Sequence, residues 1–158
     1  MIAESEASNE WSSGTQNDNR LKGGYEPVPT RDIHFNQLGY KQAFKVMLLR
    51  YAAPIAQYHY TGYTMVAEEN LDFIVKYQPE GQPYLRPHHD ASSVTVVITL
   101  NRRGIDFEGG GTHFIRQKCH AFSPKGYATL HPGRVTHQHE GLETTKGTRY
   151  IIVSFIDQ

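Results

Sequence analysis

The amino-acid sequence predicts a mainly β fold, a β-sandwich or barrel supported by a helix. Two observations lead to this class. From residue 70 onward, short stretches of alternating or β-branched apolar residues follow one another at near-regular spacing, separated by turns rich in Gly and Pro. A single helical pattern precedes them, between Gly39 and about Ile55. The 158 residues are enough for one domain with a hydrophobic core.

The helical pattern is a stripe of apolar residues that recur every three or four positions, as on one face of a helix. Its members are Phe44, Met47, Leu48, Tyr51, Ala52 and Ile55. We expect this helix to pack on a sheet. Pro54 should end or kink it near its last turn, because proline lacks the backbone N–H that a helix interior requires.

Five stretches predict the strands that follow. Residues 71–77 alternate with period 2, and residues 94–100, "VTVVITL", are the β-branched run of a buried strand. Residues 112–115 and 127–131 predict two further short strands. Residues 148–156, "TRYIIVSFI", form the clearest strand pattern in the chain.

Composition gives no support to some classes of function. Sixteen basic and sixteen acidic residues cancel, so no net charge favours nucleic acid or an anionic membrane. No apolar run is long enough to span a membrane, and the polar first 20 residues contain no signal-peptide core. Cys119, the only cysteine, cannot form an intrachain disulfide. We expect residues 1–10 to be a disordered or linker tail and residues 11–158 to form the domain.

A candidate metal site begins at "LRPHHDAS", residues 85–92. Non-haem Fe(II) oxygenases bind iron through two histidines and one carboxylate on one face of the metal. His88 and Asp90 are two positions apart, so in an extended segment their side chains point to the same side. His89 should point to the opposite side, as a supporting residue or part of the lining of a groove.

The third ligand must come from a distant segment, and "HPGRVTHQHEG" offers His131, His137 and His139. His113 and His120 are further candidates near a turn. Spacing cannot choose among them, since two of the three histidines share one face of an extended segment.

An arginine at the start of the last predicted strand is a second unusual feature. Arg149 shares a strand face with Ile151 and Val153. If the co-substrate is 2-oxoglutarate, its distal carboxylate needs a fixed cation, and the planar guanidinium of arginine matches a carboxylate well.

Together these motifs resemble a known family. "RPHHDAS", "LNRRGIDFEGGG", "HPGRVTHQHEG" and "GTRYIIVSFID" resemble, in this order, the C-terminal catalytic domain of the collagen lysyl hydroxylases, within the Fe(II)/2-oxoglutarate oxygenases. "WSSG", "DNRLKGGYEPVPTRDIH" and "LDFIVKYQPEGQPYLRPHHD" resemble the same domain. The resemblance runs from about Trp11 to Asp157 and implies a double-stranded β-helix, or jelly-roll, with helices on one side.

The resemblance also implies residue roles. The iron ligands would be His88, Asp90 and His139. Arg149, Tyr77 and Arg20 would contact 2-oxoglutarate, and the arm of residues 11–25, which by itself reads as a loop, would fold over the site.

One departure concerns a position near the co-substrate. Val97 stands where the family commonly has an asparagine, and Thr95 or Thr99 on the same strand face could replace its hydrogen bond.

The implied reaction is hydroxylation of C5 of peptidyl lysine in X-Lys-Gly sequences of collagen-like chains, giving succinate and CO2. Fe(II), 2-oxoglutarate, O2 and ascorbate would be required. We expect a homodimer, and location in the endoplasmic reticulum lumen if the chain belongs to a longer secretory-pathway protein. The alternatives are an oxygenase with another peptide substrate, such as a prolyl hydroxylase, and an inactive metal-binding jelly-roll fragment.

Overall fold

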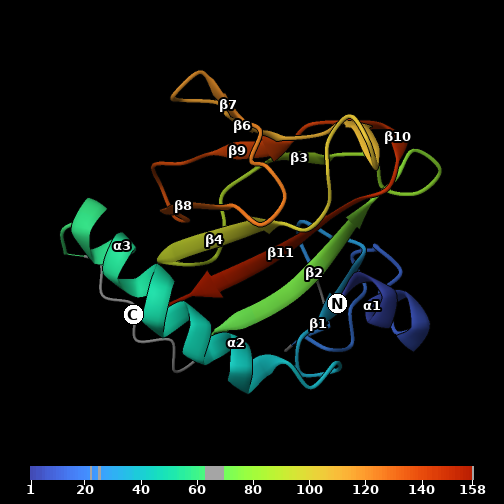
Figure 1. Cartoon of the computed structure of the whole chain (residues 1–158), viewed down its shortest axis with the longest axis horizontal. Helices are drawn as coiled ribbons and strands as arrows, with labels where there is room; N and C mark the ends of the chain where they lie inside the picture. Colours follow the sequence, from blue (N-terminus) through green and yellow to red (C-terminus); the bar gives the residue numbers. More distant parts are fainter. Residues whose placement is uncertain (22, 25, 63–69, 158) are drawn as a thin grey trace.

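The computed structural model describes residues 1–21, 23–24, 26–62 and 70–157. In this part of the chain, two antiparallel sheets lie over one another, with helices against the outer face of the larger sheet (Figure 1). The larger sheet has the strand order β1-β2-β11-β4-β8, the smaller β3-β9-β6-β7, and β10 pairs with β5. The mainly β, jelly-roll architecture expected from the sequence is therefore confirmed.

The bounds of the elements agree with the main patterns in the sequence. The strands of the larger sheet are β1 (Asp32–His34), β2 (Leu71–Tyr77), β11 (Arg149–Ile156), β4 (Val94–Thr99) and β8 (Ala128–Pro132). The remaining strands are β3 (Leu85–His88), β9 (His139–Gly141), β6 (Thr112–Phe114), β7 (Cys119–Ala121), β5 (Phe107–Gly109) and β10 (Thr144–Gly147). The helices are α1 (Ile2–Ser8), α2 (Lys41–Met47) and α3 (Ala53–His59), with the π-helical turn Leu48–Ala52 joining the last two.

The larger sheet is buried on both faces because alternate side chains of its strands serve two layers. Strand β11 lies between β2 and β4 and pairs antiparallel with both. Ile74 and Ile152, directly opposite each other, point toward the helices. Val75 and Ile151, one position along, belong to the second apolar cluster on the other face. That second face borders the cavity described below.

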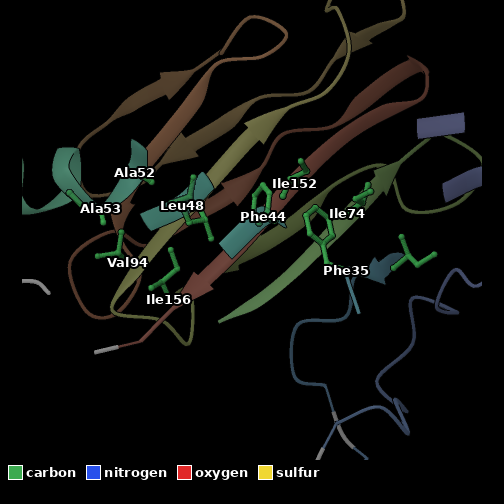
Figure 2. Close-up of a cluster of buried hydrophobic side chains, with 12 residues drawn as sticks. Phe35, Phe44, Leu48, Ala52, Ala53, Ile74, Val94, Ile152 and Ile156 are labelled. Atoms are coloured by element: carbon green, nitrogen blue, oxygen red, sulfur yellow. The ribbon is translucent and has the colours of Figure 1, made fainter. Parts of the chain in front are cut away.

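The helical layer closes the first face. Phe44, Leu48 and Ala52 of the predicted stripe pack with Ile74, Ile152 and their neighbours (Figure 2). Phe35, between β1 and α2, contacts the Phe44 ring edge-to-face at a centroid distance of 4.6 Å. The expectation that the helix packs on the sheet is confirmed.

Pro54 was expected to end or kink the helix. It does not end the helical run, which continues to His59, and a kink stays a prediction. The π-helical turn precedes it, and the Ala53 N–H donates to the Leu48 carbonyl, five residues back. Pro54 then lies in the first turn of α3, where a missing N–H is tolerated. The extra residue in the turn changes the phase of the stripe, so Ile55 is 49% exposed.

The first residues also differ from the tail expected for residues 1–10. They form α1, in which Ser5 is buried, and Glu6 binds the Lys76 ammonium at 2.7 Å and accepts a hydrogen bond from Tyr150. These partners lie on β2 and β11, so the helix is held against the larger sheet. A domain boundary at residue 11 stays a prediction. No helix among the described residues is long and apolar enough to cross a membrane.

Candidate metal centre

Two neighbouring strands of the smaller sheet and the segment after β3 bring the predicted ligands together. His88 is the last residue of β3, and His139 is the first residue of β9, directly opposite it. Asp90 follows β3, where its N–H donates to the Gly133 carbonyl. Antiparallel pairing therefore joins residues that are far apart in the sequence.

The ligand atoms are close enough to share one ion. The Nε2 atoms of His88 and His139 lie 3.3 and 3.6 Å from Asp90 Oδ1. One ligand atom from each of the three residues lies within 4.8 Å of the others. Two imidazoles and one carboxylate are the donor set of non-haem Fe(II) centres, so these residues fit that ion.

Both histidines present the same ring nitrogen. The Nδ1 of His88 lies 2.7 Å from the Arg86 carbonyl, and that of His139 lies 2.9 Å from the His137 carbonyl. Because a carbonyl only accepts, Nδ1 carries the proton in both neutral rings, and the Nε2 lone pair remains for a metal. Burial lowers the pKa of His139, which favours the neutral form that metal binding needs.

The structure distinguishes among the histidines that spacing in the sequence left as candidates for the third ligand. His139 borders the main cavity and approaches Asp90 Oδ1. His131 lies on the other side of the carboxylate, with its Nε2 3.9 Å from Oδ2. His137 hydrogen-bonds its neighbour Thr136. His113 pairs with Glu140 at 2.8 Å. The geometry thus supports His139 as the third ligand.

Asp90 remains ionised despite its burial. Burial alone would raise its pKa, but in the metal-free protein the contacts with His88 and His139 and a hydrogen bond from Thr95 together lower it. The carboxylate therefore keeps the negative charge that a divalent cation requires.

A cavity of about 630 Å³ extends from these ligands between the two sheets. Side chains of β2 and β11 form its apolar wall, and Phe73, Val75, Ile151 and Val153 are among them. Segments of the arm before β1, including Trp11–Ser13 and Asn17–Leu21, also border it. The arm thus covers the site, as the resemblance implied. A volume of this size suits a small ligand and part of a second one.

Arg149 and Tyr77 border the same cavity and are paired directly opposite each other on β11 and β2. The guanidinium carbon lies 5.3 Å from the centre of the Tyr77 ring. Arg149 donates to the Gly111 carbonyl at 3.3 Å, and no carboxylate among the described residues forms a salt bridge with it. A cation that is 5% exposed and lacks an anion indicates a site for an anionic ligand.

The pKa values of these two residues follow from burial. Burial raises the pKa of Tyr77 to about 12, so its hydroxyl is neutral and able to donate at ordinary pH. Burial lowers the pKa of Arg149, but the side chain remains charged because the ordinary pKa of arginine is far above neutral pH.

Arg20 borders the cavity, but its guanidinium is already engaged. It binds Asp18 at 2.6 Å and Asp32 of β1 at 3.0 Å. The hydrogen bond from Arg20 outweighs partial burial and lowers the pKa of Asp18 to about 2. Asp32 also accepts a hydrogen bond from Ser12 at 2.6 Å. This network ties the arm to the edge of the larger sheet, a role that the sequence did not reveal.

Two further sequence expectations concern residues near the ligands. His89 is exposed and borders the cavity, which agrees with its expected place in the lining of a groove. Thr95, one of the two threonines considered as a replacement for the asparagine missing at Val97, instead donates its hydroxyl proton to Asp90 Oδ2 at 2.6 Å. Ser92, which contacts Thr95, carries no sequence signal and was missed.

The chain was compared with known families and proteins. The model of the 2OG-Fe(II) oxygenase superfamily matches residues 45–158. Procollagen-lysine,2-oxoglutarate 5-dioxygenase 1 of Homo sapiens is 52% identical over 99% of this chain and 22% of its own length. The multifunctional procollagen lysine hydroxylase and glycosyltransferase LH3 of Rattus norvegicus is 49% identical over 99% of this chain and 21% of that protein. The chain thus spans about a fifth of these relatives.

A solved structure supports the fold independently. A prolyl-4-hydroxylase of Pseudomonas putida matches with a TM-score of 0.66 at 15% identity, covering 97% of this chain and 80% of that one. At this identity the likeness shows the fold alone. The family model covers well over half of the sequence and includes all three candidate ligands, Arg149 and Tyr77. The chain belongs to the 2OG-Fe(II) oxygenase superfamily.

Proposed function

We propose that this chain hydroxylates C5 of peptidyl lysine in collagen-like X-Lys-Gly sequences, using Fe(II), 2-oxoglutarate and O2 and releasing succinate and CO2. The observation that carries the chemistry is the joint presence, in one cavity, of the three-ligand cluster and the buried Arg149, which has no carboxylate partner among the described residues. The names of the relatives, at about half identity over the whole chain, support lysine as the substrate residue.

Each residue has a proposed task. His88, Asp90 and His139 would hold the iron through Nε2, Oδ1 and Nε2. The iron, when bound, supplies the activation of O2, with 2-oxoglutarate as the source of electrons. The protein's part is to keep the ligands in place and to limit access of water to the site.

The co-substrate would lie along Arg149 and Tyr77. Its distal carboxylate would accept two parallel hydrogen bonds from the guanidinium, and the neutral Tyr77 hydroxyl would donate a further one. This arrangement would satisfy a cation that has no carboxylate partner among the described residues. We also assign Arg20 to this co-substrate site, although contact would require it to exchange at least part of its bonding with Asp18 or Asp32.

The remaining requirements and partners follow from the proposed reaction. Ascorbate would keep the iron in its ferrous state. The peptide would approach in an extended form past the arm, with His89 at the border of the cavity. We further propose a homodimer and, if this chain is part of a longer secretory-pathway protein, location in the endoplasmic reticulum lumen.

Turnover with paired peptides tests the proposed function. The chain is incubated with Fe²⁺, 2-oxoglutarate, ascorbate and a collagen-like peptide that contains either Lys-Gly or, at the same place, Arg-Gly. Mass spectrometry should find one added oxygen on the lysine, with succinate release that depends on the lysine peptide. A proline-rich peptide without lysine serves as the third arm.

The three arms give distinct outcomes. Oxygen added to proline instead would identify a prolyl hydroxylase and refute the lysine proposal. No product from any peptide, with Fe²⁺ and 2-oxoglutarate bound, would support the inactive jelly-roll alternative. The Arg149→Met variant should lose turnover in every arm, because it removes the proposed co-substrate anchor.

A further inference from the structure

The two oxygens of the Asp90 carboxylate lie in different surroundings. Oδ1 faces the Nε2 atoms of His88 and His139, at 3.3 and 3.6 Å. Oδ2 faces the opposite way, toward Thr95 at 2.6 Å and His131 at 3.9 Å. Only the first oxygen points to the ligand cluster, so the carboxylate divides the site into a metal side and a support side.

The support side is a short chain of buried hydroxyl groups. Thr95 is 1% exposed and Ser92 is 0% exposed. A carboxylate only accepts, so the Thr95 hydroxyl must donate to Oδ2. Its oxygen can then accept the proton of Ser92, whose Oγ lies 2.7 Å away. Each hydroxyl thus has a defined direction, and the last bond of the chain is charge-assisted.

The backbone at Gly133 approaches these hydroxyl groups closely. A Cβ atom on Gly133 would lie 2.2 Å from Ser92 Oγ and 3.1 Å from the Asp90 Cβ. The Gly133 carbonyl also accepts the Asp90 N–H, and Thr95 is paired across β4 and β8 with His131. Thr95 is therefore held within β4, Ser92 lies against Gly133, and Asp90 is held by its backbone hydrogen bond to Gly133.

A carboxylate can bind a metal through one oxygen or both, and the choice decides how many coordination positions remain. Binding through both oxygens would turn Oδ2 away from Thr95 and leave a buried hydroxyl without its acceptor, which typically costs about 1–3 kcal/mol. We propose that the Ser92–Thr95 pair is a positioning device that holds the Asp90 carboxylate with Oδ1 toward the metal, so that losing the pair weakens metal binding. Binding through this one oxygen leaves positions for the co-substrate and O2, and the role of the pair rests on the metal centre proposed above.

Co²⁺ titration of the metal-free protein, followed by its visible absorption, tests this role without turnover. Thr95→Val keeps the shape of the side chain and removes the hydroxyl, whereas Thr95→Ser keeps the hydroxyl. Thr99→Val is the matched control, because Thr99 lies on the same face of β4, is also buried, and borders a separate small pocket. Thermal unfolding of each metal-free variant reports on the fold itself.

We expect Thr95→Val to bind Co²⁺ roughly 10- to 100-fold more weakly, the usual effect of losing a group that orients a metal ligand. The Co²⁺ affinity of Thr95→Ser and Thr99→Val should remain within about threefold of that of the unmodified chain. The affinity of Ser92→Ala should lie between these values and that of Thr95→Val. If Thr95→Val does not fold, the comparison rests on Ser92→Ala, which leaves Thr95 in place.

Several results would overturn the inference. One is an unchanged Co²⁺ affinity in Thr95→Val, or in Ser92→Ala if Thr95→Val does not fold. Another is a loss of Co²⁺ affinity in Thr95→Ser or Thr99→Val as large as the loss in Thr95→Val. Failure of the metal centre itself gives a different result, since the unmodified chain would then bind no Co²⁺ at this site and Asp90→Asn would change nothing.

Discussion

At the scale of single residues, the site contains two buried groups of defined charge, a cationic arginine and a neutral tyrosine. Arg149 is a buried cation that lacks a carboxylate partner among the described residues, and Tyr77 beside it is a buried phenol kept neutral. An unpaired buried cation destabilises the empty fold unless a ligand completes it. Replacing Arg149 should therefore change the affinity for 2-oxoglutarate and the stability of the metal-free protein in different ways.

Replacing Arg149 with methionine should weaken 2-oxoglutarate binding to the Co²⁺-loaded protein by roughly 10- to 100-fold, the equivalent of a charged hydrogen bond. Co²⁺ affinity should stay nearly unchanged, and the metal-free variant should be at least as stable as the original. Calorimetric titration and thermal unfolding measure these quantities, with Arg102→Met, at an exposed arginine, as the control. A variant that loses Co²⁺ and keeps 2-oxoglutarate would contradict the assignment.

His131 predicts how stability depends on pH in the metal-free protein. It is 2% exposed, and burial lowers its pKa to about 4, against about 6.5 in an unfolded chain. Between these values the unfolded state binds a proton that the folded state does not. Its contribution is therefore fully present above about pH 6.5 and is lost as the pH falls toward 4.

The free energy of unfolding should therefore fall by roughly 2 kcal/mol between about pH 6.5 and pH 5 from this residue alone. Denaturant titrations with EDTA present measure it. His131→Gln, which does not titrate, should show a smaller slope over the same range. Equal slopes in the two proteins would show that His131 is not the residue responsible.

At the scale of elements, the glycine run before β6 determines whether Arg149 can lie in its cavity. Gly110 has a φ of +63°, and a Cβ there would lie 2.9 Å from Arg149 Cδ. Gly111 has a φ of +113°, and its Cβ would lie 2.5 Å from the Phe122 ring. The glycines of this turn thus also provide the space for Arg149, the proposed anchor of the co-substrate.

Gly110→Ala should weaken 2-oxoglutarate binding and destabilise the fold by more than the usual strain of about 1 kcal/mol. Gly104→Ala is the matched control, since Gly104 also has a positive φ, of +80°, but nothing lies within 4 Å of its Cβ position. Calorimetry and thermal unfolding measure the two effects. If both variants lose the same amount of stability and keep their affinity for 2-oxoglutarate, the close approach of Gly110 to Arg149 does not matter for co-substrate binding.

At the scale of the whole molecule, the sequence predicted those features that depend on regular repetition. The period of two predicted β2 and β11 and put Arg149 on one face with Ile151 and Val153, and the spacing of His88 and Asp90 indicated two candidate ligands. The place of Tyr77 beside Arg149 was expected only from the family resemblance. The exact turn of the helix was not predictable, because the period of 3.6 assumes that no π turn intervenes. Spacing alone could not choose His139 over His131, and the choice made there rested on the family resemblance. The two different sides of Asp90 give it a geometric reason.

Anaerobic equilibrium binding of Fe²⁺ tests the central claim most directly, when the unmodified chain is compared with His139→Ala and His137→Ala. The second variant keeps the backbone carbonyl that holds the His139 ring. The account predicts one tightly bound iron per chain in the unmodified protein and in His137→Ala, and loss of that iron in His139→Ala. Full iron binding by His139→Ala, or its loss in His137→Ala alone, would contradict it.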